Sequence, residues 1–151
     1  MTNNRTILIT GVTGNQGGAV ARALRGAGFH LRGLTRKPDS ERAAALARHG
    51  VEIVKGDLDD EATLRSALAG AWGVFGVQNA GEAGVEREEA QGKRLATLAR
   101  EAGVEHYVYT SVGSAHKRTG IPLEREFGRT LTKLPEWARR HGRPNGQGEH
   151  A

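Results

Sequence analysis

The chain has 151 residues and a net charge of +5, with 37% hydrophobic and 5% aromatic residues. It is long enough for one domain, whose core must be built mainly from Ala, Val, Leu and Ile. It contains no cysteine, which excludes a disulfide framework, a thiol nucleophile and a Cys-based zinc site. No apolar run approaches the ~20 residues that span a bilayer, and residues 1–5 lack a signal-peptide core. We therefore expect a soluble, cytoplasmic protein.

The charge pattern bears on possible partners. Most basic residues alternate with acids, as in Glu86–Glu89, which is typical of solvated helix faces. Only residues 139–143 form a basic cluster, so the pattern disfavours a nucleic-acid partner. The six histidines are scattered without metal-ligand spacing, and no metal site is expected.

The most informative stretch is residues 6–19. An apolar run ends in Gly11, Gly14 and Gly17, and a helical pattern follows at once. This order predicts a buried strand, a tight turn and a helix whose N-terminus faces a pyrophosphate. Gly11 would allow the turn, Gly14 a close phosphate, and Gly17 close helix packing. Thr13, Asn15 and Gln16 would border the cofactor. The alternative is an ordinary glycine-rich turn.

Further strands and helices alternate along the chain. We expect strands at 29–34, 51–54, 72–77 and 104–110. Asp39 or Ser40 can cap the second helix, and Asp59 or Asp60 the third. A fourth helix is expected over 85–102. Its inward-facing residues would be Ala90, Leu95, Leu98 and Ala99.

This alternation predicts an α/β fold, a doubly wound parallel sheet with helices on both faces. The simplest strand order is 3-2-1-4-5. Ligands bind such sheets beyond the carboxyl ends of the strands, at the switch point. The loops expected to carry chemistry are 11–17, 35–37, 56–59, 78–81 and 111–114.

The end of the second strand indicates which dinucleotide binds. NAD-binding units place an acidic residue there, about 20 residues past the glycines. Here Arg36 lies 19 residues after Gly17, and Lys37 follows it. A guanidinium binds a 2′-phosphate through a bidentate fork. The sequence therefore favours NADP(H) over NAD(H), the alternative being a solvated turn.

The remaining loops supply further cofactor-binding candidates. Asp57 and Leu58 would flank the adenine, unless Asp57 caps a helix. Gln78 and Asn79 follow the fourth strand. Ser111, after the fifth strand, either binds the substrate or nicotinamide ribose or caps its loop.

Five motifs give the chain a family resemblance. Residues 7–18 and 34–36, Gly56–Asp60, Gln91–Lys93 and Tyr107–Ser111 occur in the order seen in the NmrA-like family, whose members are atypical short-chain dehydrogenase/reductase relatives with a Rossmann-like fold. The resemblance covers Thr6 to about Pro122.

The resemblance implies NAD(P)(H) binding, often NADP(H), with Lys93 approaching the cofactor. Some members are reductases, for example of quinones, and others are regulators that sense the dinucleotide redox state. A small-molecule substrate or a regulatory protein partner is therefore expected. The Tyr-x-x-x-Lys motif of short-chain dehydrogenases is absent, because Ser111 and Gly113 lie four residues after the two tyrosines. No catalytic residue is assigned.

The chain changes character after Pro122. Apolar residues at 123, 127, 131 and 134 have helical spacing, and residues 139–151 have a disordered composition. Family members are about twice as long. We therefore expect a dinucleotide-binding domain over 1–122 and a divergent basic tail over 123–151, as in a truncated or frameshifted relative.

Overall fold

Five parallel strands form one sheet at the centre of the protein. The computed structural model describes residues 4–78 and 85–110. The strand order is β3-β2-β1-β4-β5, and all four pairings are parallel. The strands are β1 (Thr6–Ile9), β2 (His30–Thr35), β3 (Glu52–Lys55), β4 (Ala71–Gly76) and β5 (His106–Tyr109). The fold class and strand order predicted from the sequence are confirmed.

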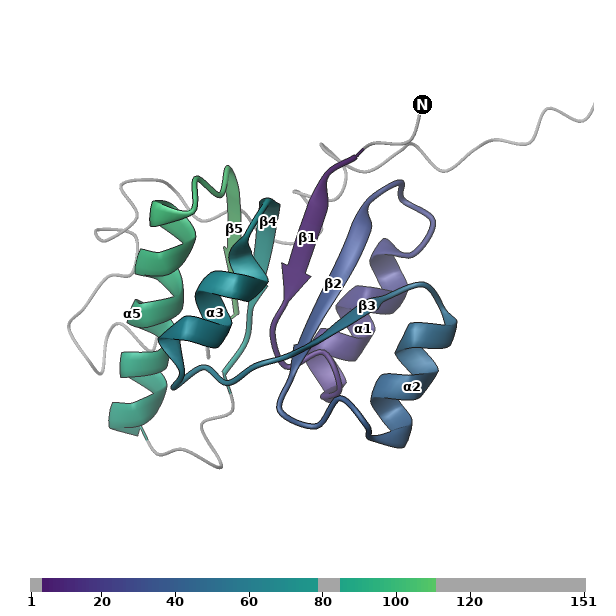
Figure 1. Cartoon of the computed structure of the whole chain (residues 1–151), viewed down its shortest axis with the longest axis horizontal. Coiled ribbons are helices and arrows are strands. Elements are labelled where there is room, and N and C mark those ends of the chain that lie inside the picture. The colour runs from purple at the N-terminus through teal and green to yellow at the C-terminus, as the bar shows by residue number, and fades with distance from the viewer. Residues whose placement is uncertain (1–3, 79–84, 111–151) are drawn as a thin grey trace, which may run out of the picture.

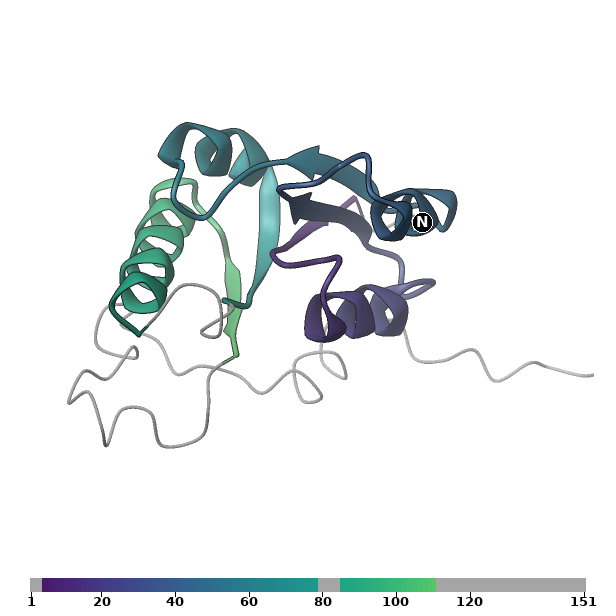
Figure 2. The same ribbon diagram turned by 90° about the horizontal axis from the view of Figure 1, so that it is seen from below.

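Helices connect successive strands and cover both faces of the sheet (Figures 1 and 2). The described helices are α1 (Asn15–Leu24), α2 (Glu41–Arg48), α3 (Glu61–Leu68) and α5 (Val85–Glu101). Figure 2 shows α1 on one side of the sheet and α3 on the other. From β1 the chain adds β2 and β3 on one side of β1, and then adds β4 and β5 on its other side. The switch point therefore lies between β1 and β4.

Each face of the sheet has its own apolar core, built from aliphatic side chains. On one face Val20, Ala21 and Leu24 of α1 pack over Ile7 and Ile9. On the other face α3 and α5 pack over Leu8 and Val74; the buried helix residues are Leu64, Ala67, Leu68, Leu95, Leu98 and Ala99. Because side chains alternate along β1, Ile7 and Ile9 lie in one core and Leu8 lies in the other.

The structure decides between the alternative helix caps and corrects one core assignment. The Ser40 hydroxyl accepts from the Ala43 N–H, and the Asp60 carboxylate accepts from two N–H groups of α3. Ala90 is exposed, so its predicted inward orientation is wrong. It lies on the solvent side of α5, where the sequence could not distinguish a small surface residue from a core one.

Several predictions fall on residues outside the described ranges. These are Asn79, Ser111, the domain boundary at 122, the helix over 123–134 and the tail beyond it. Among the described helices, none has the length and apolar character needed to cross a membrane.

Candidate dinucleotide-binding site

The glycine loop between β1 and α1 is closely packed against its own backbone. Gly11 has a positive φ of 55°, a conformation that favours glycine. The Gly14 N–H donates to the Gly11 carbonyl at 2.9 Å and closes the turn. A Cβ on Gly17 would lie 2.2 Å from the Gly11 carbonyl oxygen. The start of α1 can approach this loop so closely only because residue 17 has no side chain, which confirms the packing role predicted for Gly17.

The N-terminus of α1 lacks the polar caps found on the two helices that follow. Its N-cap is Gly14, it has no side-chain cap, and its first turn has no acidic residue. By contrast, Ser40 caps α2 and Asp60 caps α3, and each of those helices has a glutamate in its first turn. The first-turn N–H groups of α1 and its positive dipole end are therefore available to an anion. Asn15 and Gln16 begin this helix and are exposed.

Cationic side chains gather where β2 ends. Arg36 and Lys37 are both exposed in the turn between β2 and α2. The Thr35 hydroxyl accepts from the Lys37 N–H at 3.1 Å, which orders this turn. The Arg42 guanidinium donates to the Thr13 carbonyl of the glycine loop at 3.3 Å. The glycine loop and the first turn of α2, which are distant in the sequence, thus meet near the predicted ribose position.

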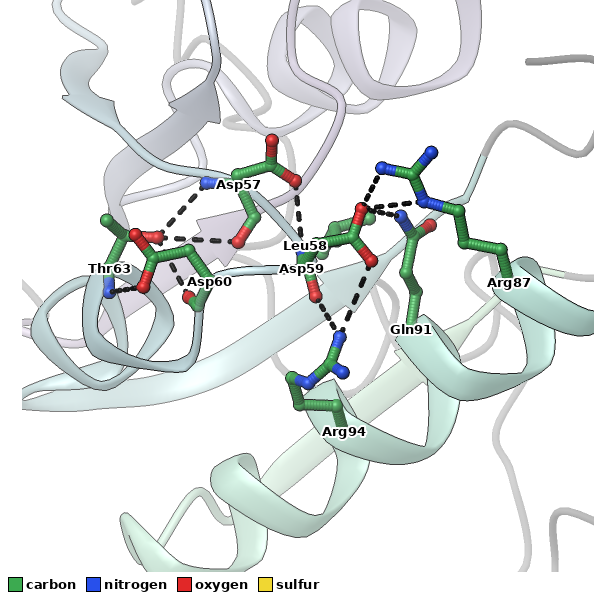
Figure 3. A network of polar contacts seen from close by, with 8 residues as sticks. All are labelled: Asp57, Leu58, Asp59, Asp60, Thr63, Arg87, Gln91 and Arg94. Carbon is green, nitrogen blue, oxygen red and sulfur yellow. Dashed lines mark hydrogen bonds and ion pairs between the residues drawn. The ribbon is translucent and has the colours of Figure 1, made fainter. Parts of the chain in front are cut away.

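The loop after β3 is held by its own side chains (Figure 3). The Asp57 carboxylate accepts from the Asp59 N–H at 2.9 Å. The Thr63 hydroxyl accepts from the Asp57 N–H at 3.1 Å. The cap of α3 is Asp60, so the alternative that Asp57 caps the helix is wrong. Asp57 instead orders the loop, and both Asp57 and Leu58 are half-buried there.

Asp59 joins this loop to α5 (Figure 3). One of its carboxylate oxygens accepts from Arg87 and, at 2.9 Å, from Gln91. The other lies 3.6 Å from the Arg94 guanidinium, which also donates to the Leu58 carbonyl at 2.8 Å. The hydrogen bond from Arg87 is the main reason that the pKa of Asp59 is lowered. The residues that would flank the adenine are therefore fixed to the helix that carries Lys93.

We expect Asp59→Asn to destabilise the protein by about 1 kcal/mol or less at pH 7, because solvent screens exposed ion pairs. The lowered pKa means that the carboxylate stabilises the fold above its ordinary pKa of 3.8. This contribution is lost as the pH falls through the still lower pKa of the folded state. Urea unfolding of both proteins between about pH 3 and 7 should show the difference shrinking toward acid.

An Arg87→Gln background provides the control, because Asp59 there lacks its main partner. Asp59→Asn should cost less in that background. A difference that stays constant with pH, or that is equal in both backgrounds, would contradict the role given to the Asp59–Arg87 pair.

Two contacts join the strand ends at the switch point. The buried Thr10 hydroxyl donates to the Val77 carbonyl at 3.0 Å, and accepts from the Val77 N–H at 2.8 Å. Beyond it, the Thr110 hydroxyl donates to the Gln16 amide oxygen at 2.8 Å. These contacts hold the end of β4 against β1 and bring the start of α1 to the end of β5.

Gln78 follows this region and carries buried amide atoms. Neither its amide nitrogen nor its amide oxygen has a hydrogen-bond partner among the described residues. A buried amide without partners is costly, and a bound ligand is one way to satisfy it. This observation and the side-chain-free cradle at Gly17 fit a dinucleotide crossing the sheet edge.

The two tyrosines of β5 both have raised pKa values, so their phenols are neutral at pH 7. Burial raises the pKa of the Tyr107 phenol strongly. Burial also raises the pKa of Tyr109, and the charge of Glu88 adds to the effect. Lys93 lies on α5, where its ammonium pairs with Glu89 at 2.7 Å. Its predicted approach to a cofactor stays a prediction.

No group of three or more His, Cys, Asp and Glu side chains within residues 4–78 and 85–110 has the arrangement of a metal site. The described site contains the first-turn N–H groups of α1, the cations after β2 and the hydrogen-bonded loop after β3. The ends of β1, β2 and β3 carry them in that spatial order. The contact of Arg42 with the glycine loop and those of Asp59 with α5 were not predicted from the sequence, because the partners are far apart along the chain.

The family model described as the NmrA-like family matches residues 3–129. The chain belongs to the NmrA-like family. A curated relative, the NmrA-like family domain-containing oxidoreductase hkm9 of Aspergillus hancockii, is 36% identical over 140 residues. These make up 89% of this chain and 42% of that protein. The NmrA-like chain thus spans less than half the length of this relative.

Solved structures show the same likeness. NmrA, a negative transcriptional regulator solved with NAD, has a TM-score of 0.66 and 28% identity, over 74% of this chain and 34% of that one. NmrA has also been solved with NADP. The quinone oxidoreductase QOR2 of Escherichia coli, solved with NADPH, has a TM-score of 0.59 and 32% identity, over 70% of this chain and 36% of that one.

Proposed function

We propose that this NmrA-like chain binds NADP(H) along the carboxyl edge of its sheet. The observation that carries the proposal is the N-terminus of α1, which has a glycine N-cap and no first-turn acid, beside a glycine loop that a Cβ at Gly17 would disrupt. A pyrophosphate would accept hydrogen bonds from these N–H groups. The related structures with NADP or NADPH support the same ligand.

The strand order assigns each part of the dinucleotide to a loop. From the pyrophosphate at the end of β1, the adenosine half runs over β2 and ends at β3. Arg36 and Lys37 would then bind the 2′-phosphate, and Asp57 and Leu58 would border the adenine. The other half would pass the switch point toward Gln78, with Asn79, Lys93 and Ser111 as further contacts.

We propose further that the chain is the cofactor-binding part of an NADPH-dependent reductase of a small substrate such as a quinone. The likeness to the quinone oxidoreductase QOR2 supports this reaction class. The bound dinucleotide would supply a hydride. The protein would hold the dinucleotide in one orientation along the ends of the strands. The N–H groups of α1 would bind its pyrophosphate, and Gln78 would lie toward its nicotinamide half. Substrate-binding walls would come from residues outside the described ranges or from another chain.

Thermal unfolding with NADP+, NADPH, NAD+ and NADH tests the proposed binding. A ligand at about 100 times its dissociation constant adds about 2.7 kcal/mol to the stability of a folded state that alone binds it. For a domain of this size that corresponds to a rise of roughly 10 °C in Tm. The phosphorylated forms should raise Tm more than the others. An absence of any shift would contradict NADP(H) binding, and an equal shift with all four would contradict the preference for NADP(H) over NAD(H).

A second function, a redox-sensing regulator acting through a protein partner, is favoured by the likeness to NmrA, a negative transcriptional regulator. The two functions differ in what the cofactor does. A regulator must bind its partner with different affinity when NADP+ or NADPH is bound, by linkage. A reductase must oxidise NADPH when a quinone is added. Partner binding and NADPH absorbance, measured on the same preparation, separate the two.

A further inference from the structure

We propose that Arg42 is a specificity-determining residue, a third cation that binds the 2′-phosphate of NADP(H) together with Arg36 and Lys37. The inference rests on the proposed NADP(H) binding and goes beyond it. Arg42 lies in α2, outside the turn in which the sequence places the phosphate ligands. In a sequence it is one exposed arginine among many.

The position of Arg42 is the first support. Its guanidinium extends from the first turn of α2 to the glycine loop, where it donates to the Thr13 carbonyl at 3.3 Å. The side chain therefore bridges the loop after β1 and the helix after β2. Ser40 fixes the start of that helix through its hydrogen bond from the Ala43 N–H at 3.3 Å, so the base of the Arg42 side chain is well held.

The strand order places the ribose at the same point. β2 lies between β1 and β3 in the sheet. A dinucleotide with its pyrophosphate at the end of β1 and its adenine at the end of β3 must cross the end of β2 with the ribose between them. The 2′-substituent would then lie close both to the turn that carries Arg36 and to the Arg42–Thr13 bridge.

The chemistry of the bridge favours a phosphate as its further partner. A guanidinium has five N–H donors in a planar fork, and the bond to Thr13 uses a single nitrogen. A phosphate dianion is a stronger acceptor than a carbonyl and accepts the bidentate geometry.

The same contact has a purely structural alternative, in which Arg42 only fastens α2 to the glycine loop. Removing such a fastener would loosen the loop for every dinucleotide alike. Removing a phosphate ligand would weaken NADPH alone, because NADH has a hydroxyl at that position. The ratio of the two affinities therefore separates the alternatives, whatever happens to stability.

The test is fluorescence titration of the full chain with NADPH and NADH, for the wild type, Arg42→Gln and Arg42→Lys. Arg48→Gln is the matched control, because it removes the same charge from the last turn of the same helix. We expect Arg42→Gln to raise the Kd of NADPH about tenfold, which is about 1.4 kcal/mol, and to change that of NADH less than twofold. Arg42→Lys should recover part of the loss, and Arg48→Gln should change neither Kd.

Each other result overturns a defined statement. If Arg42→Gln weakens both dinucleotides equally or weakens neither, or if Arg48→Gln lowers NADPH affinity as much, Arg42 is not a phosphate ligand, and the proposed NADP(H) binding still stands. If the wild type prefers NADH or binds neither dinucleotide, the proposed function fails and this inference fails with it.

Discussion

Gly17→Ala should destabilise the protein and abolish dinucleotide binding. A Cβ at this position would lie 2.2 Å from the Gly11 carbonyl oxygen, 2.7 Å from the Gly11 carbonyl carbon and 2.9 Å from the Thr10 carbonyl oxygen. All three are backbone atoms, which cannot rotate away as a side chain can. Helix α1 must therefore shift away from the loop, at a cost of about 1–3 kcal/mol. The shift also displaces the first-turn N–H groups from the pyrophosphate position.

Urea unfolding and NADPH titration measure the two effects, and Gly92→Ala is the matched control for the unfolding measurement. Gly92 also lies within a helix, but a Cβ there would meet its nearest neighbour, the Tyr109 hydroxyl, at an ordinary 3.4 Å. Alanine is the better helix former by up to about 1 kcal/mol, so this variant should be as stable as the wild type or more so. A Gly17→Ala protein with wild-type stability and NADPH affinity would contradict the packing described for the glycine loop.

Arg36→Ala should raise the Kd of NADPH about 10- to 100-fold and leave that of NADH almost unchanged. Charge-assisted hydrogen bonds contribute about 1.5–3 kcal/mol, and each 1.4 kcal/mol is a tenfold change in affinity. The effect should exceed that of Arg42→Gln, because Arg36 lies directly after β2, where the ribose would cross the sheet. Equilibrium titration of both dinucleotides measures it.

Two companion variants sharpen the result. Arg36→Asp should reverse the preference toward NADH, since a carboxylate repels the 2′-phosphate and can accept from a ribose hydroxyl. Arg100→Ala removes a charge from the last turn of α5 and should change neither affinity. An equal loss for NADPH and NADH in Arg36→Ala would assign this arginine to the loop structure instead of the phosphate.

Local patterns were enough to predict the sheet. The apolar run before Gly11 and the regular return of strand and helix patterns specify parallel β-α units, and chain handedness then leaves few strand orders. The close approach at Gly17 was also predictable, because only glycine permits it. The choice of Ser40 over Asp39, and of Asp60 over Asp59, needed the structure, since neighbouring residues of similar chemistry compete for each cap.

Contacts between distant segments were not predictable. Asp59 and Arg87 are 28 residues apart, and Arg42 and Thr13 are 29 apart. In the sequence each arginine is typical of a solvated helix face, and only the folded topology brings its helix against the loop that it contacts. The orientation of Ala90 was also not predictable from the sequence. It is exposed, although a small apolar residue fits either side of a helix.

Side-chain hydrogen bonds join the loop at the proposed adenine subsite to helix α5. The Leu58–Asp59 segment, which would border the adenine, is bonded to Arg87, Gln91 and Arg94 of α5. The same helix carries Lys93. A substitution in this cluster should therefore be examined for effects at both ends of the dinucleotide.

The central claim is that NADP(H) lies along the carboxyl edge of the sheet with its 2′-phosphate over the end of β2. The most direct test is a comparison of backbone amide NMR shifts in the NADPH and NADH complexes of the full chain, because the two ligands differ only in that phosphate. We predict that both ligands shift the amides of residues 11–18. The difference between the two complexes should be concentrated in residues 35–42 and at Thr13. An absence of shifts in the glycine loop, or a difference concentrated elsewhere, would contradict the account.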